Sequence, residues 1–125
     1  MRIIFYIAIV IICLGCLRDC EAESQEQEQE LTWTDTQIVD AIYWAEGGTE
    51  TNHPYGILTK YKVTTPRQAC FNTVRNQRKR HAAHDCGKDF LTCLRDRYCP
   101  LNADNDPTNL NVNWLKNVKY FLGKN

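Results

Sequence analysis

The sequence has no apolar run long enough to cross a membrane and no excess of charge of either sign. Its apolar run from Ile3 to Leu14 spans 12 residues, well short of the ~20 that a membrane-spanning helix needs. The 125 residues carry 15 Lys and Arg against 15 Asp and Glu. No basic stretch is interleaved with aromatic residues in the way that nucleic-acid-binding proteins often show. We therefore expect no membrane-spanning helix and no nucleic-acid partner.

The short apolar run has the features of an export signal. It follows a positive residue, Arg2, and its length fits the core of a signal peptide, which we place at residues 1–22. The segment Cys13-Leu14-Gly15-Cys16 is similar to a lipoprotein signal in which Cys16 would carry the lipid. Cleavage after Ala22 is the alternative. Either form predicts a protein exported to the cell envelope or secreted, with membrane attachment through an N-terminal lipid in the first case.

An acidic linker and a folded body are expected after the signal. Residues 23–30 alternate Glu with Gln or Ser, which gives the segment no apolar area to bury and predicts disorder. Residues 31–125 are enough for one small core. From Leu31 onward, Lys and Arg exceed Asp and Glu by four, which favours an anionic partner such as a wall or membrane surface.

The body contains four of the seven cysteines, Cys70, Cys86, Cys93 and Cys99. In an exported domain of this size we expect them to form two disulfides, and the spacing leaves all three pairings open.

Two groups of residues contain side chains of the kinds that bind metals, but neither group shows a complete metal-binding pattern. Asn102, Asp104 and Asp106 alternate as in a calcium loop, but Pro107 and Asn113 stand where such a loop needs Gly and Glu. A possible set of zinc ligands consists of His81, His84, Cys86 and Cys70. Zinc binding there would compete with disulfide formation by the two cysteines. We expect no metal and no cofactor.

Capping signals and apolar spacing predict a mainly helical body. Thr34-x-x-Gln37 and Thr65-x-x-Gln68 have the form of capping boxes that open helices. Two further helices are expected over about 88–98 and from Leu110 to Leu122. Residues 49–64 are polar with a β-prone segment around Tyr61, which predicts a minor β lobe.

Glu46 ends the first predicted helix, directly before Gly47 and Gly48. A carboxylate there faces the negative end of the helix dipole, which favours its protonated form. Partial burial beside Tyr43 and Trp44 would act in the same direction. A carboxylic acid that remains protonated near neutral pH can serve as a general acid.

The segments Ala45-Glu46-Gly47-Gly48 and Tyr55-Gly56-Ile57 together resemble the start of a lysozyme-like, soluble lytic transglycosylase domain. In that family the catalytic Glu ends the first core helix, and a Gly-containing segment then lines the saccharide cleft. This chain has Gly47 where the family usually has Ser, and Leu58-Thr59 where it usually has Met-Gln.

The resemblance implies a disulfide-stapled α+β lysozyme-like fold and an enzyme that cleaves peptidoglycan at its β-1,4 bonds, with Glu46 as the catalytic residue. A transglycosylase needs only this one acid. A hydrolase would need a second carboxylate, for which Glu50, Asp104 and Asp106 are candidates. A non-catalytic wall-binding or protein-binding module on the same fold is the alternative. The residues implied for substrate binding are Tyr55, Gly56, Ile57, Tyr98 and Trp114.

Some of these candidate residues also have a purely structural interpretation. Trp114 shares helical spacing with Val118 and Phe121, which favours core packing over stacking on a sugar. Tyr55 lies in a turn and is the better candidate for a ligand contact. The basic run Arg75, Arg78, Lys79 and Arg80 is expected to form a solvated helix face, with contact to an anionic surface as the alternative.

Overall fold

The computed structural model describes residue 25 and residues 32–124. The expected signal peptide at 1–22, with Cys16, and the linker at 23–30 lie outside the described residues, apart from Gln25. None of the described helices is both long and apolar enough to cross a membrane.

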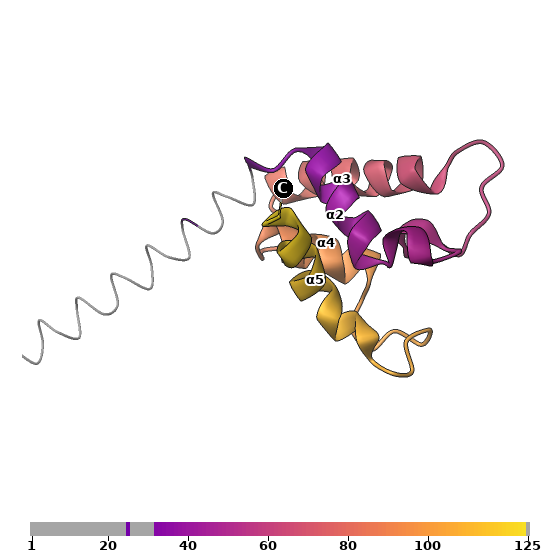
Figure 1. The fold of residues 1–125 in the computed structure, drawn as a ribbon. Helices are drawn as coiled ribbons and strands as arrows, with labels where there is room; N and C mark the ends of the chain where they lie inside the picture. Colours follow the sequence, from indigo (N-terminus) through magenta and orange to yellow (C-terminus); the bar gives the residue numbers. More distant parts are fainter. Residues whose placement is uncertain (1–24, 26–31, 125) are drawn as a thin grey trace, which may run out of the picture. The chain divides into compact units, whose positions relative to one another are not determined.

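From Trp33 onward, four α-helices carry the fold (Figure 1). They are α2 (Asp35–Ala45), α3 (Pro66–Ala82), α4 (Phe90–Tyr98) and α5 (Trp114–Leu122). Three short 3₁₀ segments join them: η1 (Gly48–Glu50), η2 (Pro54–Gly56) and η3 (Leu110–Asn113). The prediction of a small, mainly helical body is confirmed.

The helix starts follow the capping chemistry of the sequence. Thr34 accepts the Gln37 backbone N–H at 3.2 Å, and the Gln37 side chain accepts the Thr34 N–H at 2.9 Å, so the first capping box is complete. The second is half formed. Thr65 accepts the Gln68 N–H, but the Gln68 side chain donates to Asn72 instead. Pro66 at the first turn of α3 supplies the favourable backbone geometry there.

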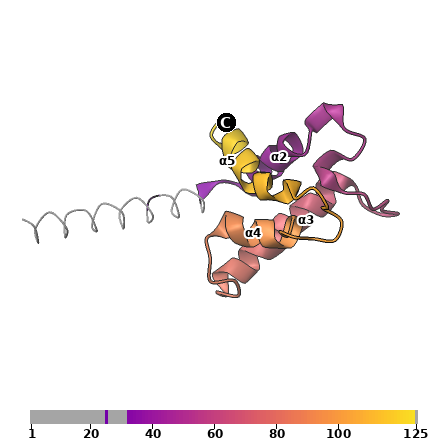
Figure 2. The same cartoon turned by 90° about the horizontal axis from the view of Figure 1, so that it is seen from below.

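The core lies between α2, α3, α4 and α5. Figure 2 shows α5 beside α2 and α4 beside α3, and α2 also contacts α3. Each helix buries one apolar stripe, as its spacing predicts. The most buried side chains are Ile38, Val39 and Ile42 of α2, Cys70 and Val74 of α3, Phe90, Leu91 and Leu94 of α4, and Trp114, Val118 and Leu122 of α5.

The expected β lobe is not present, because residues 32–124 contain no strand. The segment from Leu58 to Val63 exposes its large side chains, with Val63 98% exposed. An extended segment with no neighbouring strand has no ladder of hydrogen bonds to stabilise it. The β-prone composition around Tyr61 therefore produces an open connection between η2 and α3.

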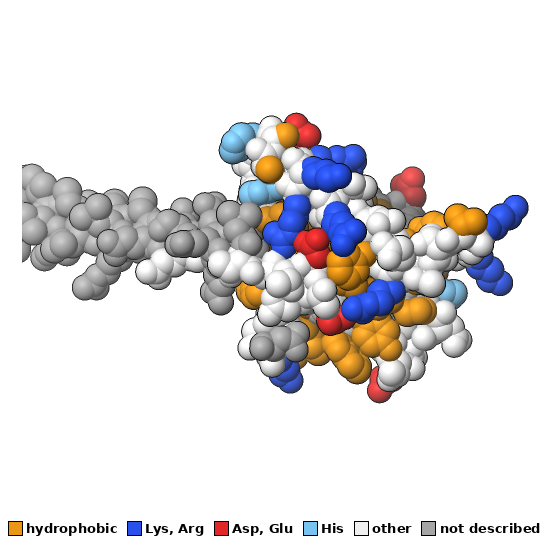
Figure 3. All heavy atoms as spheres, turned by 90° about the horizontal axis from the view of Figure 1, so that it is seen from above, with side chains coloured by type: hydrophobic (Ala, Val, Ile, Leu, Met, Phe, Trp, Pro, Cys, Tyr) orange, Lys and Arg blue, Asp and Glu red, His pale blue; other side chains and the backbone are white. Residues whose placement is uncertain are grey.

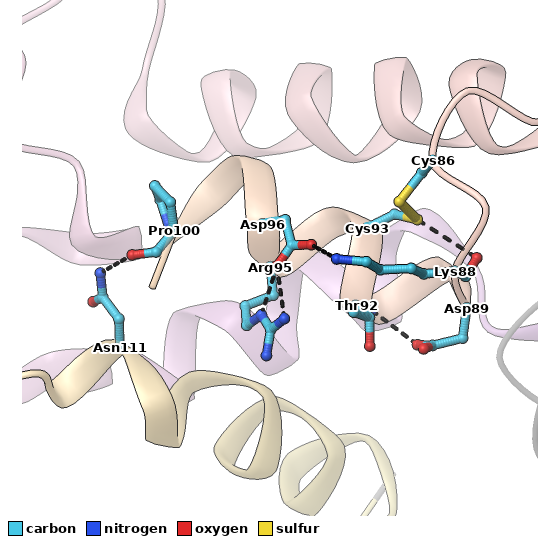
Figure 4. Close-up of polar contacts among 9 residues, drawn as sticks. All are labelled: Cys86, Lys88, Asp89, Thr92, Cys93, Arg95, Asp96, Pro100 and Asn111. Carbon is cyan, nitrogen blue, oxygen red and sulfur yellow. Dashed lines mark hydrogen bonds and ion pairs between the residues drawn. A yellow bond between two sulfur atoms is a disulfide. The ribbon is translucent and has the colours of Figure 1, made fainter. Parts of the chain in front are cut away.

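Within residues 32–124 there is one disulfide, between Cys86 and Cys93 (Figure 4). It ties the loop after α3 to the first turn of α4. Cys70 and Cys99 are free thiols, so the expected second disulfide is not formed. Cys70 is fully buried, while Cys99 donates through its Sγ to Asn111 Oδ1 at 2.7 Å.

Candidate active site

Glu46 is the C-cap of α2 and projects into a cavity. Its backbone N–H donates to Ile42 O at 3.0 Å, so the last helical hydrogen bond fixes where the side chain begins. Gly47 follows at φ +100°, a conformation that a residue with a side chain rarely adopts. The helix therefore ends abruptly, with the carboxyl group at its negative pole.

The Gly56 backbone lies directly against the Glu46 carboxyl. A Cβ atom built at Gly56 would be 2.6 Å from Glu46 Oε2 and 2.9 Å from its Cδ. Only glycine leaves room for the carboxyl at this distance, and Gly56 also has φ +64°. The structure thus brings together Glu46 at the helix end and the Tyr55-Gly56-Ile57 turn, which eight residues separate in the sequence.

Tyr55 holds this turn and is not available for stacking on a ligand. It is 6% exposed, its ring packs 5.3 Å from that of Tyr43, and its φ is +64°. Arg67 Nη1 donates to its hydroxyl at 3.1 Å and to Asp40 Oδ1 at 2.7 Å. The left-handed backbone at Tyr55 turns the ring into the core, which corrects the expectation of a ligand-contacting Tyr55.

Tyr98 fixes the other side of the same turn. Its hydroxyl donates to the Tyr55 carbonyl oxygen, and burial raises the pKa of this hydroxyl, so that it remains a donor. Its ring packs 5.6 Å from that of Trp114. Tyr98 therefore positions the turn from α4. Ile57 is half-buried against the core.

The cavity beside Glu46 has a volume of about 330 Å³ and is rich in side-chain amides. Asn111 is held in place, since its Nδ2 donates to Pro100 O at 2.8 Å (Figure 4) and its Oδ1 accepts the Cys99 thiol. Asn113 and Asn117 are exposed on the α5 side. Amide groups both donate and accept hydrogen bonds, as the hydroxyl groups of a sugar require. The cavity is lined by Ala45, Glu46, Cys99, Leu110, Asn111, Asn113, Trp114 and Asn117.

Trp114 is 4% exposed and forms part of the core, as its helical spacing predicts. Its indole Nε1 is nonetheless a buried donor with no hydrogen-bond partner among the described residues. The indole lies near the Glu46 carboxyl and counteracts part of the rise in its pKa. Trp114 thus contributes a polar edge to the cavity without offering its ring as a platform.

Burial raises the pKa of the Glu46 carboxyl, and the indole of Trp114 opposes this with a smaller effect. Removing a carboxylate from water favours its neutral form. Burial of Cys99, and to a smaller extent the negative charge of the nearby Glu46 carboxylate, raise the pKa of the Cys99 thiol to about 11. Cys99 is therefore a protonated thiol at neutral pH and not an activated nucleophile.

Among the described residues, Glu46 is the single carboxyl group that lines this cavity. Glu50 lies on η1 and Asp104 in the loop before η3, and both are exposed. Asp106 accepts the backbone N–H groups of Leu110 at 2.9 Å and Asn111 at 2.8 Å. It therefore caps the start of η3, and the Asx-rich segment at 102–106 forms turns.

No group of three or more His, Cys, Asp or Glu in the described part of the chain is arranged to hold a metal ion. Cys86 is consumed by its disulfide, and the His81 ring shares a hydrogen bond with Lys88 O at 3.1 Å. The zinc alternative for these residues is therefore not supported.

The basic run of α3 is divided by its ion pairs. Arg78 Nε donates to Asp35 Oδ1 at 2.5 Å, and Arg75 lies 3.6 Å from the other oxygen of Asp35. Figure 3 shows cationic side chains next to acidic ones on this face, with no unbroken basic patch. This part of α3 is a solvated face that also anchors the start of α2.

Sequence reasoning missed the residues that complete the cavity. Two of them, Asn111 and Asn117, lie in an Asn-rich segment that carries no local structural signature. Arg67 was not predicted to support the turn, because its contact with Tyr55 joins residues 12 apart in the sequence. Comparison with family models, with curated proteins and with solved structures finds no match.

Proposed function

We propose that this chain cleaves the β-1,4 glycosidic bonds of peptidoglycan or a related glycan, in the manner of the lytic transglycosylases that it resembles, with Glu46 as the general acid and base. One observation carries the proposal: the Glu46 carboxyl, with its raised pKa, lies in a cavity against the Gly56 turn. A protonated carboxyl beside a ligand-sized space is the arrangement that general-acid catalysis requires.

The reaction needs one group that first donates a proton and then accepts one. Glu46 donates its proton to the glycosidic oxygen as the bond to the anomeric carbon breaks, through an oxocarbenium-like transition state. The resulting carboxylate then accepts the proton of the sugar's own 6-hydroxyl, whose oxygen bonds to the anomeric carbon and closes a 1,6-anhydro ring. Glu46 ends the cycle protonated. Support for this route over hydrolysis is that no second carboxyl group lines the cavity among the described residues.

The amide groups around Glu46 support a saccharide as the ligand. Asn113 of η3 and Asn117 of α5 line the cavity together with the apolar side chains of Ala45 and Leu110. Polar amides beside an apolar surface suit a sugar, which presents hydroxyl groups at its edge and C–H groups on its face. The net positive charge of the body suits an anionic wall polymer.

The test is incubation of the purified protein with peptidoglycan sacculi, followed by mass spectrometry of the soluble products. We expect products with 1,6-anhydro ends, and we expect Glu46→Gln to abolish their release while its circular dichroism spectrum stays native. Glu50→Gln, which removes an exposed carboxylate four residues away, is the matched control and should keep full activity.

The other outcomes contradict the proposal in different ways. Reducing ends without anhydro ends would mean hydrolysis. Sacculus binding without any product would mean the binding module. Product release that survives Glu46→Gln would remove Glu46 from catalysis.

We further propose that the protein acts outside the cytoplasm, in the cell envelope or after secretion. Support comes from the signal-like segment at 1–22 and from the Cys86–Cys93 disulfide, since disulfides persist in oxidising compartments. Chemical mapping of the mature N-terminus tests this. A lipidated Cys16 would mean membrane attachment, a start near Glu23 would mean ordinary cleavage, and an intact Met1 would contradict export.

A further inference from the structure

A second cavity, of about 710 Å³, lies between α3 and α4 on the side of the disulfide. It shares no lining residue with the cavity of Glu46. The Cys86–Cys93 disulfide forms part of its wall and holds the loop after α3 against α4. It is lined by Gln77, Arg80, Asp85, Cys86, Cys93, Asp96 and Arg97.

One polar group at this cavity is buried at a cost that the described structure does not offset. The Nη1 atom of Arg80 is buried and has no hydrogen-bond partner among residues 32–124. Gln77, from the same helix, is 3% exposed and is the buried polar residue of the described core. Buried polar groups are normally hydrogen-bonded, and an unmade bond to a guanidinium is expensive. Arg80 therefore gains from a ligand that accepts hydrogen bonds, and the Gln77 side chain lines the same cavity.

The charges around the cavity favour a monoanion. Arg80 and Arg97 form no ion pair with any described residue. Of the two acids, Asp96 is already neutralised by Lys88 at 2.7 Å and Arg95 at 2.6 Å (Figure 4), which lowers the pKa of Asp96. Asp85 remains and would repel a dianion such as phosphate. A carboxylate carries one charge and fits the planar fork of a guanidinium group.

We propose that this cavity binds the carboxylate group of a small organic acid, held by the guanidinium groups of Arg80 and Arg97 and the side-chain amide of Gln77. The volume, about 710 Å³, leaves room for the group that carries the carboxylate. The proposal does not depend on Glu46 or on glycan cleavage, because the two cavities have no residue in common.

Titration of the ¹⁵N-labelled protein with N-acetylalanine, followed by NMR, tests the proposal. We expect saturable shifts at Gln77, at Arg80 and in the loop around the disulfide. N-acetylalaninamide, which lacks the carboxylate, should cause none of them, and inorganic phosphate should bind more weakly. Absence of saturable shifts with N-acetylalanine would overturn the proposal. Equal or tighter binding of phosphate would also overturn it.

Three substitutions sharpen the test. Arg80→Gln and Arg97→Gln should each weaken N-acetylalanine binding about tenfold or more, as loss of a charge-assisted hydrogen bond predicts. Lys79→Gln removes the same charge from an exposed neighbouring position on α3 and should leave binding unchanged. If Arg80→Gln does not fold, the exposed Arg97→Gln decides the matter. If Arg97→Gln and Lys79→Gln weaken binding equally, the net charge of the protein explains the binding of N-acetylalanine, and a specific site is contradicted.

Discussion

Glu46 and Gly56 are in such close contact that a methyl group at position 56 would be 2.6 Å from Glu46 Oε2. The end of α2 and the 3₁₀ turn are separate elements, and together they fix the position of the Glu46 carboxyl. The α2 cap fixes the backbone of Glu46, and the turn fixes the space that its side chain can occupy. The candidate active site therefore depends on the turn as much as on the acid.

Replacing Gly56 by alanine should separate this contact from ordinary backbone strain. We expect Gly56→Ala to cost about 1–2 kcal/mol of stability because of its positive φ. It should also lower glycan cleavage about 100-fold, the order expected when a reacting group moves by about 1 Å. Thermal unfolding and release of soluble products measure the two effects.

The control is Gly87→Ala. Gly87 has φ +69°, but a Cβ atom there would meet nothing within 4 Å. It should show the stability loss without the loss of activity. If both variants retain full activity, the carboxyl position is not set by the turn.

The raised pKa of Glu46 makes stability depend on pH in a defined direction. Because the folded state holds this proton more tightly than the unfolded chain, the stability of the wild type falls as pH rises from the ordinary Glu pKa to the raised one. Below the ordinary pKa both states are protonated and Glu46 contributes no penalty.

Glu46→Gln should remove this dependence. Its gain in unfolding free energy over the wild type should be near zero at about pH 4, the region of the ordinary Glu pKa. The gain should increase with pH and then level off. Urea denaturation across this range measures it, with Glu50→Gln as the control for loss of one exposed carboxylate. A gain that does not change with pH would mean that the carboxyl is not desolvated.

The helices could be predicted from the sequence because their signals are local or periodic, whereas the meeting of Glu46 with the glycine turn is implied only by the family resemblance. Thr34 and Gln37 predict the start of α2 from a segment of four residues, and the apolar stripe around Ile38 and Ile42 predicts its buried face. The role of Tyr55 could not be predicted this way. Its left-handed φ of +64° turns the ring inward and is supported by contacts from distant segments.

The cysteines and the connection after η2 show the same limit. Cys86 and Cys93 pair across seven residues, but four cysteines allow several pairings, and only the helix packing decides among them. Cys70 lies inside the core, where its spacing on α3 places it with the apolar stripe. For the segment around Tyr61, strand propensity alone cannot supply a partner strand.

Tyr98→Phe should loosen the turn while leaving the core intact. The substitution removes the hydroxyl that donates to the Tyr55 carbonyl, at an expected cost of about 1 kcal/mol. We expect a fall in kcat with little change in KM, because the turn positions the acid more than it binds the glycan. Tyr120→Phe, at a 56% exposed tyrosine, should change neither. A rise in KM alone would instead make Tyr98 a substrate contact.

Removing the disulfide should destabilise the domain without directly disturbing the candidate active site. The loop closed by Cys86 and Cys93 spans seven residues, for which the loop-entropy model gives about 2–3 kcal/mol. The double variant Cys86→Ser/Cys93→Ser should lose this much in urea denaturation, and adding a reductant should not destabilise it further. Equal stability with and without the bond would mean that α3 and α4 hold this loop by packing alone.

Trp114→Phe should change the pH profile of the reaction more than its rate at low pH. The indole N–H stabilises the charged form of Glu46, so its loss should raise the pKa of that carboxyl further. The protonated acid would then persist to higher pH, and the alkaline limb of the kcat/KM profile should shift to higher pH. Trp44→Phe, at a 49% exposed residue of the same helix end, should leave the limb in place. A shift to lower pH in Trp114→Phe would mean that desolvation by the large ring, and not its N–H group, dominates the effect of Trp114 on Glu46.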